Sequence, residues 1–600
     1  MSTTVKDRAR TLLTIIAGTL AIIDLVAIAL LITGSQRSVG LGFTLLRPPH
    51  VFGAAEVGAA LCGIVAVSAW RRPWLRRAGV VGATAMLLVA LCVGSASSRR
   101  TFPAGDGALL ESYTLLATQG RLVYGPYSRF GWHHPGPLYF WTAAPFYGLA
   151  DHKTGGLYVA VMFINMASIV AAVWVVARFG SPSLTVTMLI ALVGYAWRAR
   201  EIFVSTWNPH VPIMPALALI PVCAAIAAGE VTLLPLAAVF ASFSAQTHAS
   251  LAPYSVGLPG VAVIVATARS RIATGIWADP RTRRVLHLTA WLLAVLWSGP
   301  IAEQMTHTPG NLTQIWRFFG EPHGGPTTGQ AFIAWADNVA GIFLPAFRFQ
   351  GGGTFRPSEF FWPLAWAPLQ LLLLAPAVLV LAKRRSFDAA FAAMTLAGLI
   401  IAFWSVTRVV ETIPEYGIVW ITAIGTLGTV ALTRAGLALV ADATGVSPPV
   451  PSWATKCLCA VAVVACGAIA WQRYSDTGPI ARTRLARSER EVRSLFENVQ
   501  AYLKESGARR PLLRIRGDTW SAAAGLVFQL QLAGIDFGVE RQSVFLFTDE
   551  FAADGTEDAE LTLSTGTLHS ELSARAGNVV LAATDSLCAD AILGSQLHGP

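Results

Sequence analysis

The sequence predicts a mainly α, polytopic helical membrane protein with about 13 transmembrane helices and a small C-terminal α/β domain. Of its 600 residues 54% are hydrophobic and only 13% are charged, whereas a soluble globular protein carries about 25% charged residues. The charges gather in short clusters between long apolar runs, as in membrane-spanning helices. From about residue 472 the composition changes to that of a soluble domain.

A transmembrane helix needs about 20 predominantly apolar residues. By this criterion residues 1–471 form the transmembrane domain, with long loops at 97–155 and 301–361. A shorter, proline-containing run, Leu138–Leu149, is predicted to be an interfacial or re-entrant helix. The thirteen candidate spans are Leu12–Thr33, Val51–Trp70, Ala78–Val93, Leu157–Val176, Leu184–Trp197, Val211–Ala228, Val231–Ala245, Tyr254–Ala268, Val285–Trp297, Trp362–Ala382, Ala389–Trp404, Ile418–Val440 and Ala454–Trp471.

Basic clusters predict the orientation, because cytoplasmic loops carry an excess of Lys and Arg. Three clusters, after the second, eighth and tenth spans, fall on the side of the N-terminus. We therefore expect a plasma-membrane protein with a cytoplasmic N-terminus, extracytoplasmic long loops and an extracytoplasmic C-terminal domain. The net charge of +10 is then assigned to anchoring at the cytoplasmic face, and no nucleic-acid partner is predicted. The clusters are Arg71, Arg72, Arg76 and Arg77; Arg269, Arg271, Arg281, Arg283 and Arg284; and Lys383, Arg384 and Arg385.

Residues 472–600 are predicted to form the small soluble α/β domain. Helices are expected at Ile480–Glu505 and Thr519–Leu532. Strands are expected at Leu512–Ile515, Val544–Phe547 and Val579–Ala582. The domain contains neither a G-x-G-x-x-G fingerprint nor a P-loop, so nothing in it supports nucleotide binding.

The loop Gly105–Phe140 contains the candidate catalytic residues. Asp106 lies between glycines just beyond a span, where a carboxylate can act as a general base toward an acceptor hydroxyl. The alternative role is an N-cap for a helix over Ala108–Thr118, and the two roles are compatible. Glu111, five residues on, is a candidate second acid or metal ligand, or else part of a solvated helix face.

The segment YGPYSRFGWHHPGP in the same loop predicts a phosphate site. Its glycines and prolines favour turns, which would present Arg129, His133 and His134 to a phosphate. Arginine suits phosphate through its planar fork of donors. Side chains of adjacent histidines diverge, so joint metal ligation is disfavoured. No metal site is predicted, and a divalent cofactor stays open. The alternative is an interfacial belt of aromatic residues.

Other polar residues are predicted at the same outer ends of the spans. Polar groups there are costly unless they have a function, although each alone is compatible with a loop residue or a satisfied histidine. We therefore predict one substrate cavity formed by Tyr127, Asn208, His210, His248, Glu411 and Tyr416, with Arg408 as a further phosphate-binding residue. The second long loop adds Glu303, His307, Asn311, Arg317, Glu321 and His323 to the substrate-facing surface.

An outer loop with an acid near its start, GDGALLESY, followed by an interfacial helix and by HHPGPLYFW and WNPH, resembles the GT-C superfamily of polytopic membrane glycosyltransferases, particularly actinobacterial members. The resemblance covers 1–471. It implies a polyprenyl-phosphate sugar donor and inverting transfer to a cell-envelope glycan, lipid or protein acceptor, with Asp106 as the catalytic acid of the first loop. By analogy, arabinofuranose or mannose is the favoured sugar. The chain departs from the family pattern because the loop follows the third span and no Asp-Asp or Asp-Glu pair is present.

Two other functions stay open on the sequence. A transporter or flippase of a lipid-linked saccharide predicts inverted repeats and paired broken helices, and no convincing repeat is found. A non-catalytic partner in envelope synthesis predicts an idle site. The C-terminal domain is expected either to bind the acceptor glycan or to pack over the outer loops.

Overall fold

The computed structural model describes residues 100–269, 279–345, 347, 349, 352–445, 451–477, 487–565, 578–583 and 587–593, with five positions between 84 and 95. Two of the three predicted N-terminal spans lie entirely outside the described residues, and the third lies almost entirely outside. Contacts divide the chain into one unit of Met1–Thr101, Ala143–Ala160 and Tyr474–Arg484, and another of Phe102–Thr142, Val161–Arg473 and Leu485–Pro600. All the predicted site residues belong to the second unit.

Helices occupy the ten other predicted spans. By length and hydropathy, six helical segments of the described chain can cross a membrane, or seven if α12 and α13 (Ser298–Thr306), which meet at a bend of 49°, form one span. The chain is thus a multi-pass membrane protein, but this number does not reach the thirteen predicted. The ten are α6 (Thr154–Phe179), α7 (Pro182–Arg198), α8 (Ile213–Ala227), α9 (Leu234–Thr247), α10 (Ala252–Arg269), α12 (Pro280–Leu296), α16 (Trp362–Ala382), α17 (Ser386–Thr407), α19 (Ile421–Thr444) and α20 (Ser452–Thr477).

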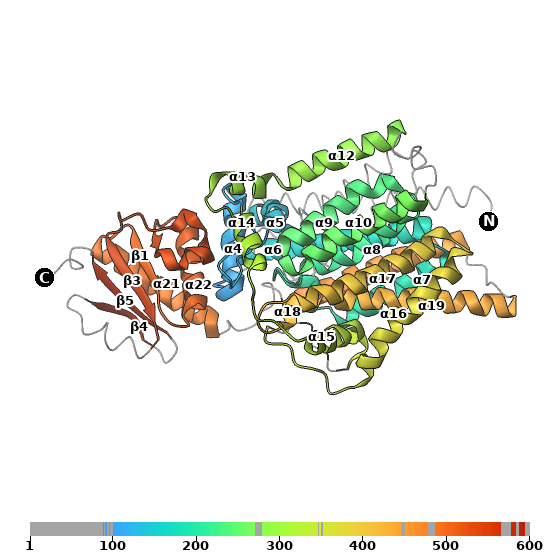
Figure 1. Cartoon of the computed structure of the whole chain (residues 1–600). Coiled ribbons are helices and arrows are strands. Elements are labelled where there is room, and N and C mark those ends of the chain that lie inside the picture. Colours follow the sequence, from blue (N-terminus) through green and yellow to red (C-terminus); the bar gives the residue numbers. More distant parts are fainter. Residues whose placement is uncertain are drawn as a thin grey trace, which may run out of the picture. The chain divides into compact units, whose positions relative to one another are not determined.

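Helix α8 forms the centre of the bundle in the second unit (Figure 1). Every one of its residues is buried, and α9, α10 and α17 pack against it. A helix that is apolar on all sides needs neighbours on all sides, which explains why this short helix is central. Helices α16 and α19 also pack against α17 and against each other.

Shorter helices occupy the predicted outer loops. A helix, α5 (Leu138–Leu149), has the bounds predicted for the interfacial or re-entrant helix. The first loop begins with α4 (Gly105–Thr118), and the second contains α14 (Asn311–Gly320) and α15 (Thr328–Ala340). Single turns complete the set: η1 (Ile202–Val204), η2 (Val231–Leu233), η3 (Ala249–Leu251), η4 (Gly341–Phe343) and α18 (Glu415–Ile418).

The described part of the C-terminal segment forms a five-stranded mixed sheet in the order β2-β1-β3-β5-β4. Strand β1 is parallel to β2 and β3, whereas β5 is antiparallel to β3 and β4. The strands are β1 (Pro511–Ile515), β2 (Gly538–Val539), β3 (Ala559–Ser564), β4 (Val579–Ala583) and β5 (Cys588–Leu593); the helices are α21 (Arg487–Ser506), α22 (Trp520–Leu532), α23 (Val544–Phe547), η5 (Arg541–Ser543) and η6 (Asp549–Phe551).

One predicted strand of this domain is wrong. Val544–Phe547 forms the helical turn α23, and three of its four residues are buried. An apolar run of four residues has no readable period, so its sequence fits a buried helical turn as well as a strand. The turn packs on α4, which places it beside the candidate site.

Contacts distinguish two ends of the bundle. At one end Arg385 donates to the carbonyl oxygen of Gly180 at 2.7 Å, so the basic turn 383–385 lies beside the α6–α7 turn. At the other end the hydroxyl of Ser405 donates to the carbonyl oxygen of Ser250 at 2.9 Å. The last turn of α17 therefore meets η3, and the basic turn 383–385 lies at the opposite end of α17.

Candidate active site

A hairpin between α4 and α5 carries several predicted site residues. Tyr127 and His133 form an antiparallel bridge, so they lie on opposite arms. The tip is a turn from Ser128 to Gly131, closed by a 3.1 Å hydrogen bond from the Gly131 amide to the Ser128 carbonyl. Gly131 has φ 84°, a conformation that glycine adopts without steric cost. Arg129 therefore projects from the tip of a defined turn.

Asp106 lies in the first turn of α4, where its carboxylate interacts favourably with the positive end of the helix dipole. Its Oδ1 accepts a hydrogen bond of 2.5 Å from the Tyr127 hydroxyl. The N-cap interpretation of Asp106 is wrong, because the helix begins at Gly105 and its N-cap is Ala104. The aspartate is thus directed by the hairpin and not by the helix backbone.

Tyr127 is the donor in this pair. Burial, followed by the charge of Asp106 and the hydrogen bond to it, raises the pKa of the Tyr127 phenol far above its usual range. The phenol therefore keeps its proton at every physiological pH. Within the described part of the chain, Asp106 Oδ2 accepts no hydrogen bond, so this oxygen can accept one from a substrate hydroxyl.

Arg129 pairs with Glu411, which follows α17, at 3.4 Å between Nη2 and Oε2. Both side chains are largely exposed, and the guanidinium also lies 4.8 Å from the centroid of the Phe130 ring. Glu411 has φ 60°, which is uncommon for a residue other than glycine. Its amide donates to the carbonyl oxygen of Gly324 at 2.7 Å, which holds this conformation. Strain of this kind concentrates at functional sites.

Tyr416, in α18, connects these residues to the other predicted segments. The charges of Arg129 and Asp106 both act on its phenol. Its ring lies 4.9 Å from that of Trp207 and 6.2 Å from that of His248. The hairpin, α18 and the ends of two spans therefore contribute to one group of residues.

His134 and His248 lie against each other, with ring centroids 4.5 Å apart. Burial lowers the pKa of His248 to about 3 and lowers that of His134 well below its usual range, with a further contribution from the neighbouring histidines. Nδ1 of His134 accepts from the Ala249 amide at 3.0 Å, so the proton of the neutral ring is on Nε2. Both histidines are neutral at pH 7 and offer hydrogen bonds but no positive charge.

His210 and Asn208 complete this part of the group. Nδ1 of His210 is 2.8 Å from the Ser205 hydroxyl, and burial lowers the pKa of His210 to about 4. Its Nε2 is buried and has no hydrogen-bond partner among the described residues. The Asn208 amide donates to the Thr247 carbonyl at 3.4 Å.

Three predicted residues have other surroundings. Arg408, the C-cap of α17, is exposed, and its guanidinium forms no ion pair within the described part of the chain. His133 contacts Tyr113, with 3.2 Å from Nε2 to the hydroxyl, and burial lowers the pKa of His133 to about 4. The two adjacent histidines thus diverge, as predicted. Glu111 is only 2% exposed, so its interpretation as part of a solvated face is wrong.

The burial of Glu111 has a physical cause. Helix α4 is buried all round from Ala108 to Leu116. Helices α22 and α23 of the C-terminal domain pack on it, and the Phe140 ring of α5 lies 5.3 Å from that of Tyr113. Such coverage cannot be read from the composition of α4 alone.

Sequence reasoning missed other residues beside the site. The Trp520 ring, from the start of α22, lies 6.2 Å from the Tyr127 ring. Tyr113 lies seven residues after Asp106, hence on the same face of α4, and this spacing was a usable signal. Nothing in the local sequence marks Trp520. Among the described residues no group of three or more His, Cys, Asp or Glu has an arrangement that could hold a metal ion.

No protein-family model matches the chain, and no curated protein matches it. It is similar to two solved structures of ArnT from Cupriavidus metallidurans. One is bound to undecaprenyl phosphate, with 15% identity, a TM-score of 0.48 and coverage of 86% of this chain and 99% of that one. The other, in the apo state, has 16% identity, a TM-score of 0.47 and coverage of 87% and 99%.

Proposed function

We propose that the chain is a membrane glycosyltransferase that moves a sugar from a polyprenyl-phosphate donor to a cell-envelope glycan, lipid or protein acceptor on the outer face. Arabinofuranose or mannose is the favoured sugar. The observation that carries the proposal is the pairing of Asp106 with Tyr127, beside Arg129 and a group of neutral histidines. A fixed carboxylate next to a cationic anion-binding residue is what inverting transfer from a sugar phosphate requires.

The reaction divides between these residues. The acceptor oxygen attacks the anomeric carbon of the donor sugar, and its proton passes to Asp106 Oδ2. The bond between the anomeric carbon and the phosphate oxygen breaks, and its electron pair leaves with the polyprenyl phosphate. Tyr127 donates to Oδ1 throughout, because its raised pKa keeps it protonated, and so orients the base. Attack opposite the leaving phosphate inverts the anomeric centre.

Arg129 is the candidate ligand of the leaving phosphate. Among the described residues its one ion pair is with the exposed Glu411, and a phosphate with two negative charges is a stronger partner for its donor fork. The neutral His134 and His248 add donors without adding charge. Arg408 is the second cation available to the donor.

The outer placement of the site rests on the positive-inside rule. The basic turn 383–385 lies at the opposite end of α17 from Arg408, as the Arg385–Gly180 and Ser405–Ser250 contacts indicate. If that turn is cytoplasmic, the site faces outward, where lipid-linked donors are used.

The test is the substitution Asp106→Asn in the full-length protein in membranes, with radiolabelled polyprenyl-phosphate arabinofuranose and mannose as alternative donors. Loss of a general base reduces transfer by about 10²–10⁴-fold, while the thermal midpoint should stay unchanged. The matched control is Glu359→Gln, which neutralises an exposed carboxylate on the loop before α16. Undiminished transfer by the Asp106→Asn variant would show that Asp106 is not the general base. Saccharide-lipid flux across vesicles without sugar transfer would favour the flippase alternative.

A further inference from the structure

A cavity of about 490 Å³ lies between the hairpin, helices α13 and α14, and the C-terminal domain. It falls within the range of about 300–1,000 Å³ that is usual for small-molecule sites. The residues that give it chemical character are Tyr124, His133, Glu303, His307, Arg541 and Asp549. None of them belongs to the group around Asp106, so the cavity needs a separate explanation.

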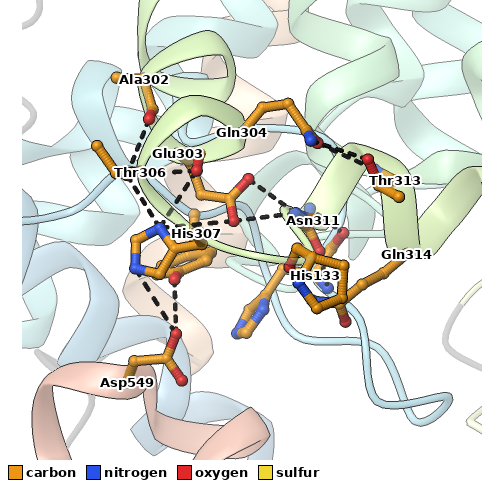
Figure 2. A network of polar contacts seen from close by, with 12 residues as sticks. His133, Ala302, Glu303, Gln304, Thr306, His307, Asn311, Thr313, Gln314 and Asp549 are labelled. Carbon is orange, nitrogen blue, oxygen red and sulfur yellow. Dashed lines mark hydrogen bonds and ion pairs between the residues drawn. The ribbon is translucent and has the colours of Figure 1, made fainter.

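A fixed polar network forms one wall (Figure 2). Glu303 is only 3% exposed, and each of its carboxylate oxygens accepts from the Asn311 amide at 2.9 Å. The Asn311 side chain in turn donates to the His133 carbonyl and accepts from the His133 amide, both at 2.8 Å. The hairpin and α14 are therefore held together before any ligand binds, which lowers the cost of binding.

The C-terminal domain closes the opposite wall through Asp549. His307 lies between two carboxylates, 3.8 Å from Glu303 and 3.8 Å from Asp549 (Figure 2). The Tyr124 hydroxyl donates to Asp549 Oδ2 at 2.9 Å. A second cavity, of about 440 Å³, shares Tyr124, His307 and Asp549 with the first. These three residues thus form a bridge between two adjoining hollows.

The lining selects a class of ligand. Two carboxylates, the side-chain amide of Gln314 and a phenol accept or donate hydrogen bonds in several directions, as a polyhydroxylated ligand requires. The flat ring of Tyr124 offers an apolar face beside these polar groups. Among the described lining residues Arg541 has the one guanidinium, and Glu303 and Asp549 outnumber it, so this lining does not favour a phosphate.

The position of the cavity relative to Asp106 sets a minimum length for the ligand. Tyr113 lies seven residues further along α4, on the same face, which is about 10 Å at 1.5 Å per residue. The Tyr113 hydroxyl contacts His133, which lines the cavity, and donates to the Leu546 carbonyl at 2.8 Å. The cavity therefore lies beside a part of α4 that is about two helical turns along the helix from Asp106. One sugar does not span this distance, whereas a chain of two or three sugars does.

We propose that this cavity binds an oligosaccharide: the sugar residues of the acceptor that do not react, while the terminal residue lies at Asp106. That the bound saccharide is the acceptor rests on the proposed function, because only a glycosyltransferase has an acceptor end at Asp106. The saccharide site itself stands on the cavity and its lining.

The test uses the purified full-length protein in lipid nanodiscs. Saturation-transfer-difference NMR measures the affinity for mannotriose and for α-1,5-linked arabinofuranotriose, with the monosaccharides for comparison. Asp549→Asn and Tyr124→Phe each remove one side of the bridge and should weaken trisaccharide binding about tenfold, since hydrogen bonds to charged groups are the stronger ones. Asp518→Asn, an exposed carboxylate elsewhere in the C-terminal domain, is the matched control and should bind as the unmodified protein does.

The outcomes separate this inference from the proposed function. Asp106→Asn should lose transfer and keep trisaccharide binding. With octyl glycosides as acceptors, Tyr124→Phe should raise KM for the trisaccharide and leave that for the monosaccharide unchanged. Absence of binding of both trisaccharides at millimolar concentration would overturn the inference, and so would trisaccharide binding by both bridge variants that equals that of the unmodified protein. Transfer that survives Asp106→Asn while Asp549 still governs trisaccharide binding would overturn the proposed function alone.

Discussion

The two ends of the helix bundle contain similar charged side chains in different surroundings. At the end that contains the basic turn 383–385, Asp388 and Arg434 form a buried ion pair of 2.8 Å. The Ser181 amide donates a hydrogen bond to Asp388, and the Ser181 hydroxyl accepts one from Arg434. At the other end, Arg129 and Glu411 are exposed and 3.4 Å apart. The comparison teaches that satisfied, buried charge fixes the fold, whereas loosely paired charge is available to a substrate.

The largest expected effect is on stability, at the buried end. Arg434→Met leaves Asp388 charged and buried, which should destabilise the fold by about 3–5 kcal/mol. Adding Asp388→Asn removes the orphaned charge and keeps an acceptor for the Ser181 amide, so the double variant should recover most of the loss. Thermal unfolding in detergent measures both. A double variant no more stable than Arg434→Met alone would mean that the charge is not the cause.

A second expected effect is a pH dependence confined to the site end. His133 has a folded pKa of about 4 against an ordinary 6.5, so the unfolded chain binds its proton first as the pH falls. Above pH 6.5 His133 is neutral in both states and does not affect the free energy of unfolding. Between pH 6.5 and 4 protonation of the unfolded chain lowers that free energy. From pH 7 to 5 the loss is about 2 kcal/mol. His133→Gln should flatten this part of the curve of thermal midpoint against pH, whereas an unchanged slope would assign the loss to other groups.

A third effect concerns the orientation of the base. Tyr127→Phe removes the hydrogen bond to Asp106 and preserves the ring that faces Trp520. We expect kcat to fall about tenfold, which is about 1.4 kcal/mol and near the lower bound for a hydrogen bond to a charged group, with the KM for the donor unchanged. Steady-state transfer kinetics separate the two constants. A rise in KM alone would show that Tyr127 binds the donor instead of orienting the base.

The smallest effect is expected at the exposed pair. Glu411→Gln removes the competitor of the donor phosphate for Arg129, and exposed pairs of this kind are worth about 0–1 kcal/mol. The KM for the polyprenyl-phosphate donor should fall by about two- to fivefold, and the thermal midpoint should not change. A higher KM would instead make Glu411 a donor-binding residue. Together with the first prediction, this result would show that the buried ion pair contributes much to the stability of the fold and the exposed pair almost nothing.

The sequence predicted what depends on composition and turns, and failed where packing decides. The apolar runs fixed the positions of ten helices, and glycine and proline marked the hairpin around Arg129. Asp106 and Tyr127 were both named, but their hydrogen bond was not predictable because it joins a helix to a hairpin arm. Glu111 was misread because helices of a distant domain cover it. Asp549 and Trp520 were missed for the same reason: their positions depend on docking between segments hundreds of residues apart.

The hairpin of residues 126–134 has a consequence for the order of events in a turnover. Tyr127, on one arm, touches the base, and His133, on the other, is tied to Asn311 in the wall of the cavity. Gly125 allows close approach, because a Cβ there would lie 2.3 Å from the His134 carbonyl oxygen, so the arms cannot move independently without separating the bridge. The base and the wall of the cavity thus share one positioning element, and a substitution that displaces either arm is expected to disturb both.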